Sequence, residues 1–285
     1  MQNMIYRLDD ARSRGILTEV HIADIHFNKK TNLKKFDKIK EEIYKNNPDY
    51  IVITGDTIDN TEIIKDKVRI KKLLLFLTDL ANFTKVIISL GNHDVYLNED
   101  LKFFKNLNEL KNIYVLNNDI YIDESIFISG LTLPNKYYYN ITKEESKEIL
   151  IEHLKKHKKL TTNLPNNLPK VSLIHSPIKL TDKVVLSYLK DYDLLLSGHT
   201  HSGMVPNFLD KFLKPNQGII APNKKLFPDI ARGKVINRLP NKAVTLIING
   251  GVTKLGEHSA KLLSKLNFVY NIDLNKIIIT DKKGR

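Results

Sequence analysis

Short apolar runs rich in valine and isoleucine recur along the chain and alternate with longer segments whose apolar residues recur every three or four positions. Three longer segments predict helices, at 32–46, 61–82 and 143–159. The short runs predict β-strands at 17–24, 49–56, 85–92, 113–118, 126–131, 170–176, 193–199, 244–249, 268–273 and 276–281. Strands that alternate with helices long enough to cover them indicate an α/β layered fold.

Residue types that bind metals follow five of the predicted strands at their carboxyl ends. These strand ends carry the segments Asp24-Ile25-His26, Gly55-Asp56-Thr57-Ile58-Asp59-Asn60, Gly91-Asn92-His93-Asp94, His175 and Gly198-His199-Thr200-His201. In a layered α/β protein, ligands bind outside the carboxyl ends of the strands. We therefore expect the five segments to converge on one crevice.

The spacing inside these segments predicts shared ions. Residues i and i+2 of an extended segment point to the same side, so Asp24 and His26 are expected to hold one ion while Ile25 faces the core. His199 and His201 have the same spacing at a turn, which leaves open whether they face one ion or two. The residues at these positions are numerous enough to bind two ions.

Glycine precedes the polar residues in three of the segments, at Gly55, Gly91 and Gly198. Without a Cβ, the backbone there can bend and approach the site closely. The chain contains no cysteine, so no thiolate is available as a ligand. Carboxylate, imidazole and amide ligands without sulfur suit manganese, iron or zinc.

The five segments together resemble the motifs of the calcineurin-like metallophosphoesterase superfamily, and the G-H-T-H segment resembles its bacterial phosphohydrolases. The pattern D-x-H, G-D-x-x-D, G-N-H-D, a lone H and G-H-x-H is intact over about 180 residues. The resemblance implies a four-layer αββα sandwich with two mixed sheets. It also implies a binuclear centre of divalent or trivalent ions, with manganese preferred and iron or zinc as alternatives.

The resemblance also implies which residues hold each ion. Metal one would take Asp24, His26, Asp56 and His201. Metal two would take Asp56, Asn92, His175 and His199, so that Asp56 bridges the ions. Two cations roughly 4 Å apart lower the pKa of a shared water. The resulting bridging hydroxide would then hydrolyse a phosphate monoester, diester or pyrophosphate.

His93 and Asp94 are the candidate catalytic residues. His93 is outside the implied ligand set, and its place beside Asn92 suits it to protonate the leaving oxygen or to stabilise the transition state. Asp94 is expected to orient His93 by accepting its other N–H. Asp59 is expected either to hold a ligand in place or to lie in a surface turn.

The stretch 203–243 differs in composition from the rest of the chain. It holds half of the ten prolines, and its eight lysines and arginines against two aspartates supply +6 of the net charge of +13. We expect a basic, mostly irregular loop inserted into a single domain that spans 1–285. A long loop of this kind is usually functional, although an insertion without a role is the alternative.

Apolar side chains stand beside lysines in this loop, with Phe208 and Phe212 next to Lys211 and Lys214. The combination fits peripheral contact with a membrane, and packing of the loop onto the domain is the alternative. No apolar run is long enough to cross a membrane, and the first residues lack the apolar stretch of a signal peptide. We therefore expect a cytoplasmic protein, with the loop as its candidate membrane contact.

Other histidines have structural interpretations. His21 is expected to lie in the core or on a sheet face, and His153 and His157 on a solvated, charged helix face. The glycine bend at Asn249-Gly250-Gly251 is expected to border the crevice, and His258 beyond it is a candidate substrate contact.

Three functions compete. The leading one is a metal-dependent phosphoesterase that acts on a phosphorylated small molecule or a lipid-linked phosphate. A nuclease acting on DNA or RNA is the second; the charge of +13 favours it, and Tyr137–Tyr139 suits base stacking or simple loop packing. Nucleases with these motifs add a capping domain for which the residues after His201 leave little room. The third is a non-catalytic scaffold, which would show missing ligands, and none is missing.

Overall fold

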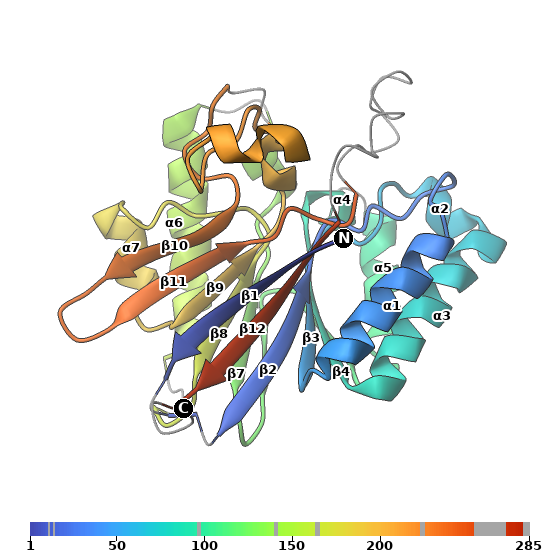
Figure 1. Ribbon diagram of the computed structural model, residues 1–285, viewed down its shortest axis with the longest axis horizontal. Coiled ribbons are helices and arrows are strands. Elements are labelled where there is room, and N and C mark those ends of the chain that lie inside the picture. Colours follow the sequence, from blue (N-terminus) through green and yellow to red (C-terminus); the bar gives the residue numbers. More distant parts are fainter. Residues whose placement is uncertain are drawn as a thin grey trace.

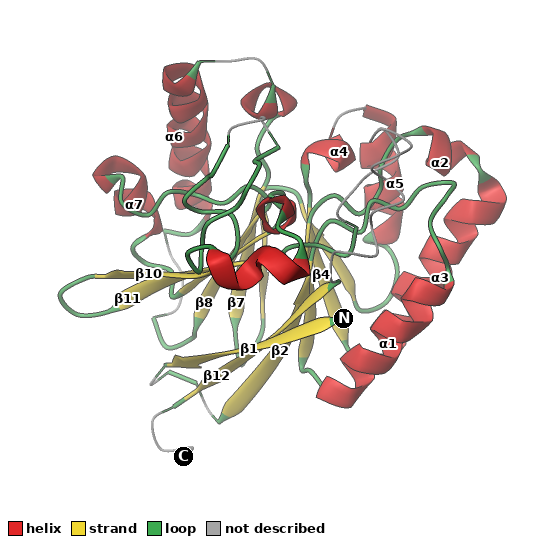
Figure 2. Ribbon diagram, turned by 45° about the horizontal axis from the view of Figure 1, so that its top comes forward, coloured by secondary structure: helices red, strands yellow, loops and turns green. Residues whose placement is uncertain are grey.

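Two six-stranded mixed sheets pack face to face, and helices cover both outer faces, so the fold is the expected four-layer αββα sandwich (Figures 1 and 2). The structure is a computed structural model. It describes all residues except 11, 14, 96–97, 140–141, 163–165, 223–225, 254–271 and 282–285.

The first sheet has the strand order β1-β12-β2-β3-β4-β5. Its strands β2 to β5 are parallel, β12 runs antiparallel to β2, and β1 is parallel to β12. The bounds are β1 Gln2–Asp9, β12 Asp273–Thr280, β2 Ile16–Ile22, β3 Tyr50–Thr54, β4 Lys85–Ser89 and β5 Ile113–Leu116.

The second sheet has the order β10-β11-β9-β8-β7-β6. Strands β11, β9, β8 and β7 are parallel, and the two edge strands run antiparallel to their neighbours. The bounds are β10 Gly233–Arg238, β11 Ala243–Ile248, β9 Leu194–Ser197, β8 Lys170–Ile174, β7 Phe127–Leu131 and β6 Asp119–Ile122.

Helices α1 and α3 cover the first sheet, and α6 and α7 cover the second (Figure 1). Their bounds are α1 Lys34–Asn46, α3 Lys67–Phe83, α6 Lys143–Leu160 and α7 Lys183–Leu189. The shorter helices are α2 Glu62–Lys65, α4 Asn92–Val95 and α5 Asn98–Leu107, with the 3-10 helices η1 Asn135–Tyr138, η2 His201–Met204 and η3 Asn207–Phe212. None of the described helices is long and apolar enough to span a membrane.

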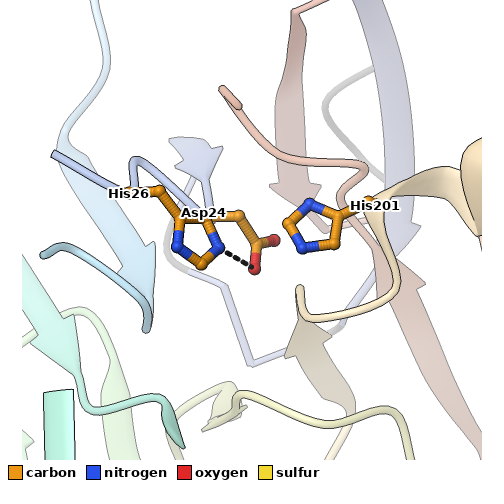
Figure 3. Close-up of side chains that lie close together, drawn as sticks. All are labelled: Asp24, His26 and His201. Atoms are coloured by element: carbon orange, nitrogen blue, oxygen red, sulfur yellow. Dashed lines mark ion pairs between the residues drawn. The ribbon is translucent and has the colours of Figure 1, made fainter. Parts of the chain in front are cut away.

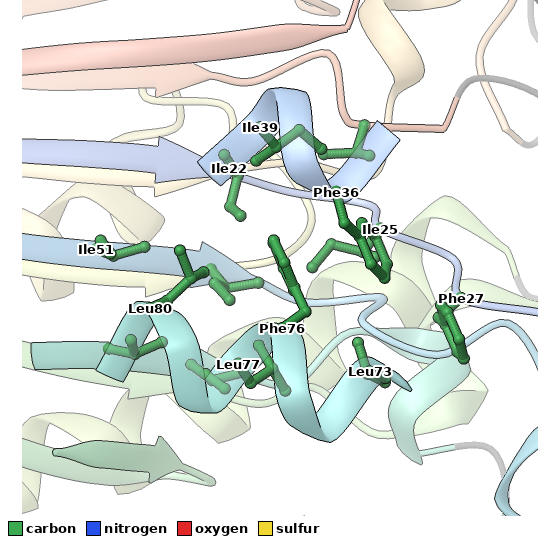
Figure 4. Close-up of a cluster of buried hydrophobic side chains, with 14 of the residues drawn as sticks. Ile22, Ile25, Phe27, Phe36, Ile39, Ile51, Leu73, Phe76, Leu77 and Leu80 are labelled. Carbon is green, nitrogen blue, oxygen red and sulfur yellow. The ribbon is translucent and has the colours of Figure 1, made fainter. Parts of the chain in front are cut away.

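Three sets of buried apolar side chains join the four layers. The first lies between the first sheet and helices α1 and α3, where the rings of Phe36 and Phe76 stack with centroids 4.3 Å apart (Figure 4). The second lies between the sheets and the third beneath α6 and α7. Apolar residues of α1 and α3 that recur every three or four positions are buried in the first set: Phe36, Ile39, Ile43, Leu73, Leu77 and Leu80.

A hydrogen-bonded clamp joins the sheets at the end where β3 and β4 begin. Oδ2 of Asp123 accepts hydrogen bonds from the hydroxyls of Tyr50 and Tyr121, each at 2.6 Å, and from Nζ of Lys85 at 2.7 Å. Tyr50 and Lys85 belong to the first sheet, whereas Tyr121 and Asp123 belong to the second. The clamp therefore fixes the spacing of the layers at the end opposite the carboxyl ends of β3 and β4.

Several elements differ from the sequence expectations. The helix expected at 61–82 is two helices, because the Asp66 side chain accepts a hydrogen bond from Arg69 N and caps a new helix there. Strands β1, β6 and β10 were not predicted. Within the stretch 203–243, which is otherwise mostly irregular where it is described, residues 233–238 form β10 and pair with β11 at the sheet edge.

Candidate metal centre

The five predicted segments lie together at the carboxyl ends of parallel strands from both sheets. Three of them follow β2, β3 and β4, and two follow β8 and β9. Backbone hydrogen bonds join these loops directly, from Asp24 N to Gly55 O at 3.1 Å and from Gly198 N to His175 O at 2.9 Å. The predicted convergence on one site is confirmed.

Three groups of side chains in this site are spaced to hold a metal ion, and within each group the ligand atoms lie within 4.8 Å of one another. The first group is Asp24, His26 and His201 (Figure 3), and the second is Asp56, His175 and His199. The remaining group, His26, Asp59 and His93, shares His26 with the first, so the first two groups divide the predicted Asp and His ligands between them. His199 and His201 therefore belong to different groups.

The carboxylate of Asp56 lies between the first two groups. Its Oδ2 is 3.5 Å from Nε2 of His26 and 3.2 Å from Nε2 of His175. Its Oδ1 accepts a hydrogen bond from the backbone N–H of His93 at 2.8 Å, which fixes the plane of the carboxylate. Asp56 is thus held in a position from which one oxygen faces both groups.

Backbone carbonyls orient two of the histidine rings. Nδ1 of His175 is 2.8 Å from Thr54 O, and Nδ1 of His201 is 2.9 Å from Thr253 O. A carbonyl oxygen only accepts, so each Nδ1 carries the hydrogen and Nε2 is left to face the site. Asn92 joins the second group, since its Oδ1 is 3.2 Å from Nε2 of His175.

His26 is oriented by a carboxylate. Its Nδ1 is 3.2 Å from Oδ1 of Asp59, so Asp59 holds a candidate ligand in place and is buried within the site. Nε2 of His26 is buried and has no hydrogen-bond partner among the described residues. A buried ring nitrogen without a partner, facing two carboxylates, is what a metal ligand needs, so the residues present fit a metal ion.

The backbone of the site is strained at the candidate ligands. Asp24, His26, Asp56, His199 and His201 all have positive φ, between 45° and 69°. Such values are uncommon for residues other than glycine and cluster at functional sites. They also correct the sequence argument for Asp24 and His26, because β2 already ends at Ile22 and these two residues are not extended.

Glycine permits two of the close approaches, as expected. A Cβ on Gly55, whose φ is +76°, would lie 2.6 Å from Nδ1 of His175. A Cβ on Gly198 would lie 2.6 Å from Oδ2 of Asp24. Any side chain at either position would push a candidate ligand out of place.

Opposite charges keep Asp56 ionised and two histidines protonated when no metal is bound. Burial favours the neutral ring of His26, yet the hydrogen bond to Asp59 and the charge of Asp56 outweigh it and raise the pKa of His26 to about 9. Burial is likewise outweighed at His175, where Asp56 raises the pKa to about 9. Burial opposes ionisation of Asp56, but His175 and His93 hold its pKa well below the usual range.

Two other candidate ligands shift in the opposite direction. Burial lowers the pKa of His199 to about 3, with a further contribution from the charge of His175. Burial also raises the pKa of Asp24 to about 6. His199 therefore presents a neutral ring with a free lone pair, which is the form that binds a metal. Binding at His26 and His175 must instead displace a proton.

The contact expected between Asp94 and His93 does not form. Nδ1 of His93 lies 2.7 Å from the backbone carbonyl of Asp59, which orients the ring in place of Asp94. The buried Asp94 carboxylate instead accepts hydrogen bonds from the N–H groups of Gly91, Thr57 and Ile58 at 2.9–3.2 Å. Asp94 therefore joins the loops after β3 and β4 and does not orient His93.

Sequence reasoning missed two neighbours of the second group. The ring of Tyr138 packs edge-on against His199 with centroids 5.1 Å apart. The hydroxyl of Tyr139 accepts a hydrogen bond from Nδ2 of Asn92 at 3.4 Å, which turns the amide oxygen of Asn92 toward His175. The tyrosine run was noticed only as a base-stacking or packing segment, and no motif connects it to the metal groups.

The bend after β11 borders the site as expected. Thr253 O orients His201, and a Cβ on Gly251 would lie 2.7 Å from Cβ of Asp24. His21 is buried within the sheet, as predicted, with Nε2 2.8 Å from Oγ1 of Thr54. His258 lies outside the described residues.

The prediction for His157 is wrong. This ring is buried, and its Nε2 is 3.0 Å from both Oγ of Ser129 and the hydroxyl of Tyr192. His157 continues the buried face of α6 that Leu150 and Leu154 begin, with spacings of four and three residues. The lysines around it hid this periodicity.

Known proteins with similar sequences are named as metallophosphoesterases. The chain is 27% identical over 204 residues to an uncharacterized metallophosphoesterase of Campylobacter jejuni. The aligned residues make up 70% of this chain and 48% of that protein. It is also 27% identical over 203 residues to an uncharacterized metallophosphoesterase of Helicobacter pylori, and that alignment covers 70% of this chain and 47% of that protein. The chain thus spans about half the length of the curated relatives it matches.

Among solved structures, a dimetal phosphatase from Danio rerio superposes with a TM-score of 0.43 and 11% identity, over 83% of this chain and 88% of that one. The sequence model of the calcineurin-like phosphoesterases matches residues 18–203. This range is about two thirds of the chain and includes all seven candidate ligands. The chain therefore belongs to the calcineurin-like phosphoesterase family, a metal-dependent family.

Proposed function

We propose that this protein is a phosphoric ester hydrolase that works with two metal ions. The observation that carries the proposal is the position of Asp56, whose Oδ2 lies within 3.5 Å of a candidate ligand from each of the first two groups. A carboxylate between two such groups is the arrangement that a shared ligand of two ions requires.

Seven residues would hold the ions, and Asp56 would bind both. Asp24, His26 and His201 would complete the first ion's ligands, and Asn92, His175 and His199 the second's. When bound, the two ions would polarise the phosphate and supply an activated water. Manganese is the first choice for this nitrogen and oxygen ligand set, with iron and zinc as alternatives.

The protein's own residues would position the ester and move one proton. His93 is about three-tenths exposed at the site, and its Nδ1 is engaged by Asp59 O, so Nε2 is the atom that would donate a proton to the leaving oxygen. Tyr138 and Tyr139 would form the wall of the site beside the second ion. The substrate would be a phosphate monoester, diester or pyrophosphate on a small molecule or a lipid.

The test combines metal analysis with hydrolysis of bis(p-nitrophenyl) phosphate in the presence of Mn²⁺. We expect two ions per chain, and we expect Asp56→Asn to lose both metal and turnover. His93→Ala should keep its metal, while kcat falls by roughly 10²–10⁴. A panel of monoesters, diesters, nucleotide-linked lipids and single-stranded DNA would then identify the substrate class.

Two results would contradict the proposal. Protein that binds no Mn²⁺ and hydrolyses no ester would instead favour the non-catalytic scaffold. Equal metal loss in Asp56→Asn and His93→Ala would refute the separate roles given to these residues. Asp49→Asn is a suitable control, because Asp49 precedes β3 at the opposite end of that strand from Asp56.

A further inference from the structure

Five large apolar side chains in the loop after His201 point into solvent. Their exposed fractions range from 40% to 72%, with the highest values at Phe208 and Phe212. We call them the apolar rim: Phe208, Phe212, Ile220, Leu226 and Phe227. The alternative expectation, that Phe208 and Phe212 pack onto the domain, is wrong.

The exposure does not come from a loosely held backbone. Gly203 O accepts hydrogen bonds from Ile219 N at 2.7 Å and from Ile220 N at 3.0 Å, and Gly218 N donates to Pro228 O at 2.9 Å. Ile220 and Leu226 face each other across an antiparallel bridge. The loop thus has a bonded interior, in which Val205 and Ala231 are buried, and it still presents its largest apolar side chains outward.

Phe227 is also held in an unfavourable backbone conformation. Its φ is +50°, in the left-handed region that bulky residues rarely adopt. Phe227 is 55% exposed. Strain of this kind persists where the surrounding structure enforces it, and here it keeps an aromatic ring on the surface.

Positive charge accompanies the apolar rim. Lys211 and Lys214 are exposed, and neither pairs with a carboxylate of any described residue. The carboxylate of Asp210, the residue before Lys211, is neutralised by an ion pair with Arg232. Nζ of Lys211 lies 5.3 Å from the ring centroid of Phe212, so charge and apolar surface are adjacent.

The loop that carries the apolar rim is bonded to the segment of the candidate metal centre that precedes it. Oγ1 of Thr200, the residue between His199 and His201, donates to Ala231 O at 2.6 Å. Helix η3, which carries Phe208 and Phe212, lies at the end of the molecule where β8 and β9 point (Figures 1 and 2). A surface on which this loop rests would therefore bring its phosphate groups close to the site.

We infer that the apolar rim and its two lysines bind an anionic lipid bilayer. The rim side chains enter the boundary between headgroups and acyl chains, and Lys211 and Lys214 contact headgroup phosphates. Nucleic acid is a poorer partner, because its phosphates would pair with the two lysines while the apolar rim stayed exposed to water. The inference goes beyond the proposed hydrolysis, because lipid binding does not require bound metal or turnover.

Co-sedimentation of the full chain with vesicles tests the inference. One set of vesicles contains phosphatidylcholine alone, and the other contains phosphatidylcholine and phosphatidylglycerol in equal parts. We expect binding to the anionic vesicles, and we expect Phe208→Ser with Phe212→Ser to weaken it by about tenfold or more. Lys211→Gln with Lys214→Gln should weaken binding by roughly tenfold on anionic vesicles alone.

The matched control replaces two equally exposed apolar residues elsewhere, Val68→Ser with Ile16→Ser, at 72% and 65% exposure. This control should bind like the unaltered protein. Circular dichroism and light scattering of every variant show whether it folds and whether it self-associates. Vesicle binding that is absent, or equal in the Phe208/Phe212 variant and the control, overturns the inference. The inference is also overturned if the unaltered protein binds no vesicles but forms a dimer that only the Phe208/Phe212 variant loses. The partner of the rim would then be a second copy of this chain.

Discussion

The replacement Glu19→Gln should stabilise this protein above neutral pH. Glu19 lies in β2 with its side chain between the two sheets, opposite Ile277 of β12 and Tyr50 of β3. It is fully buried, and neither carboxylate oxygen has a hydrogen-bond partner among the described residues. Burial, with a smaller contribution from Asp49, raises its pKa from 4.5 to about 8. An ionised carboxylate is poorly tolerated there.

The size of the effect follows from this shift. Below about pH 4.5 the carboxyl is protonated in both the folded and the unfolded chain, so it has no pH-dependent effect on stability. Between that pH and about 8, only the unfolded chain ionises, and each pH unit costs about 1.4 kcal/mol of folding free energy. The loss is about 3 kcal/mol at pH 7 and about 5 kcal/mol above pH 8.

Urea unfolding of metal-free protein in a chelator, from about pH 4 to pH 8.5, measures the difference. The free energies of unfolding of the wild type and of Glu19→Gln should agree at the acid end and diverge by about 3 kcal/mol at pH 7. Glu148→Gln, which removes an exposed carboxylate of α6, should follow the wild type at every pH. A constant difference between wild type and Glu19→Gln would refute the reasoning, because it would mean that Glu19 ionises normally in the fold.

Other predictions concern the site and the clamp. Asp59→Ala should weaken Mn²⁺ binding by about 10–100-fold, measured by calorimetry, because His26 loses the carboxylate that orients its ring. Without metal, His26 and His175 each have a pKa of about 9, so Mn²⁺ must displace their protons. Mn²⁺ affinity should therefore rise with pH up to about 9, and binding should release protons. An affinity that does not depend on pH would contradict this prediction. Asp123→Ala should lower the free energy of unfolding by about 2–4 kcal/mol, because it leaves Lys85 and two tyrosine hydroxyls without their shared acceptor. Urea unfolding would measure this loss of stability. A change below about 1 kcal/mol would argue against a clamp.

The candidate site could be predicted because its signal is local to each strand end. Asp and His residues are rarely buried in a core, so their place directly after a buried strand indicates a functional role. Parallel strands bring their carboxyl ends to one edge of the sheet, which gathers these residues. The direction of individual side chains could not be predicted in the same way. Asp94 follows His93 directly, yet on α4 it turns toward the N–H groups of Thr57 and Ile58, which belong to a different loop.

The parts of the fold that were missed depend on distant pairing. Strand β1 is an edge strand whose residues alternate between exposed and half-buried, and it pairs with β12 near the other end of the chain. Its sequence, QNMIYRLD, has no continuous apolar run to mark it as a strand. Strand β10 could not be recognised for a similar reason, since it follows a proline-rich stretch and its only strand partner among the described residues is β11.

The left-handed backbone conformation at five candidate ligands lowers the stability of the folded chain; these residues are Asp24, His26, Asp56, His199 and His201. Each such residue is disfavoured by roughly 1–2 kcal/mol relative to glycine. A glycine at any of these positions would relieve the backbone strain but would remove a candidate ligand. The candidate metal centre is therefore built at the expense of the stability of the metal-free fold.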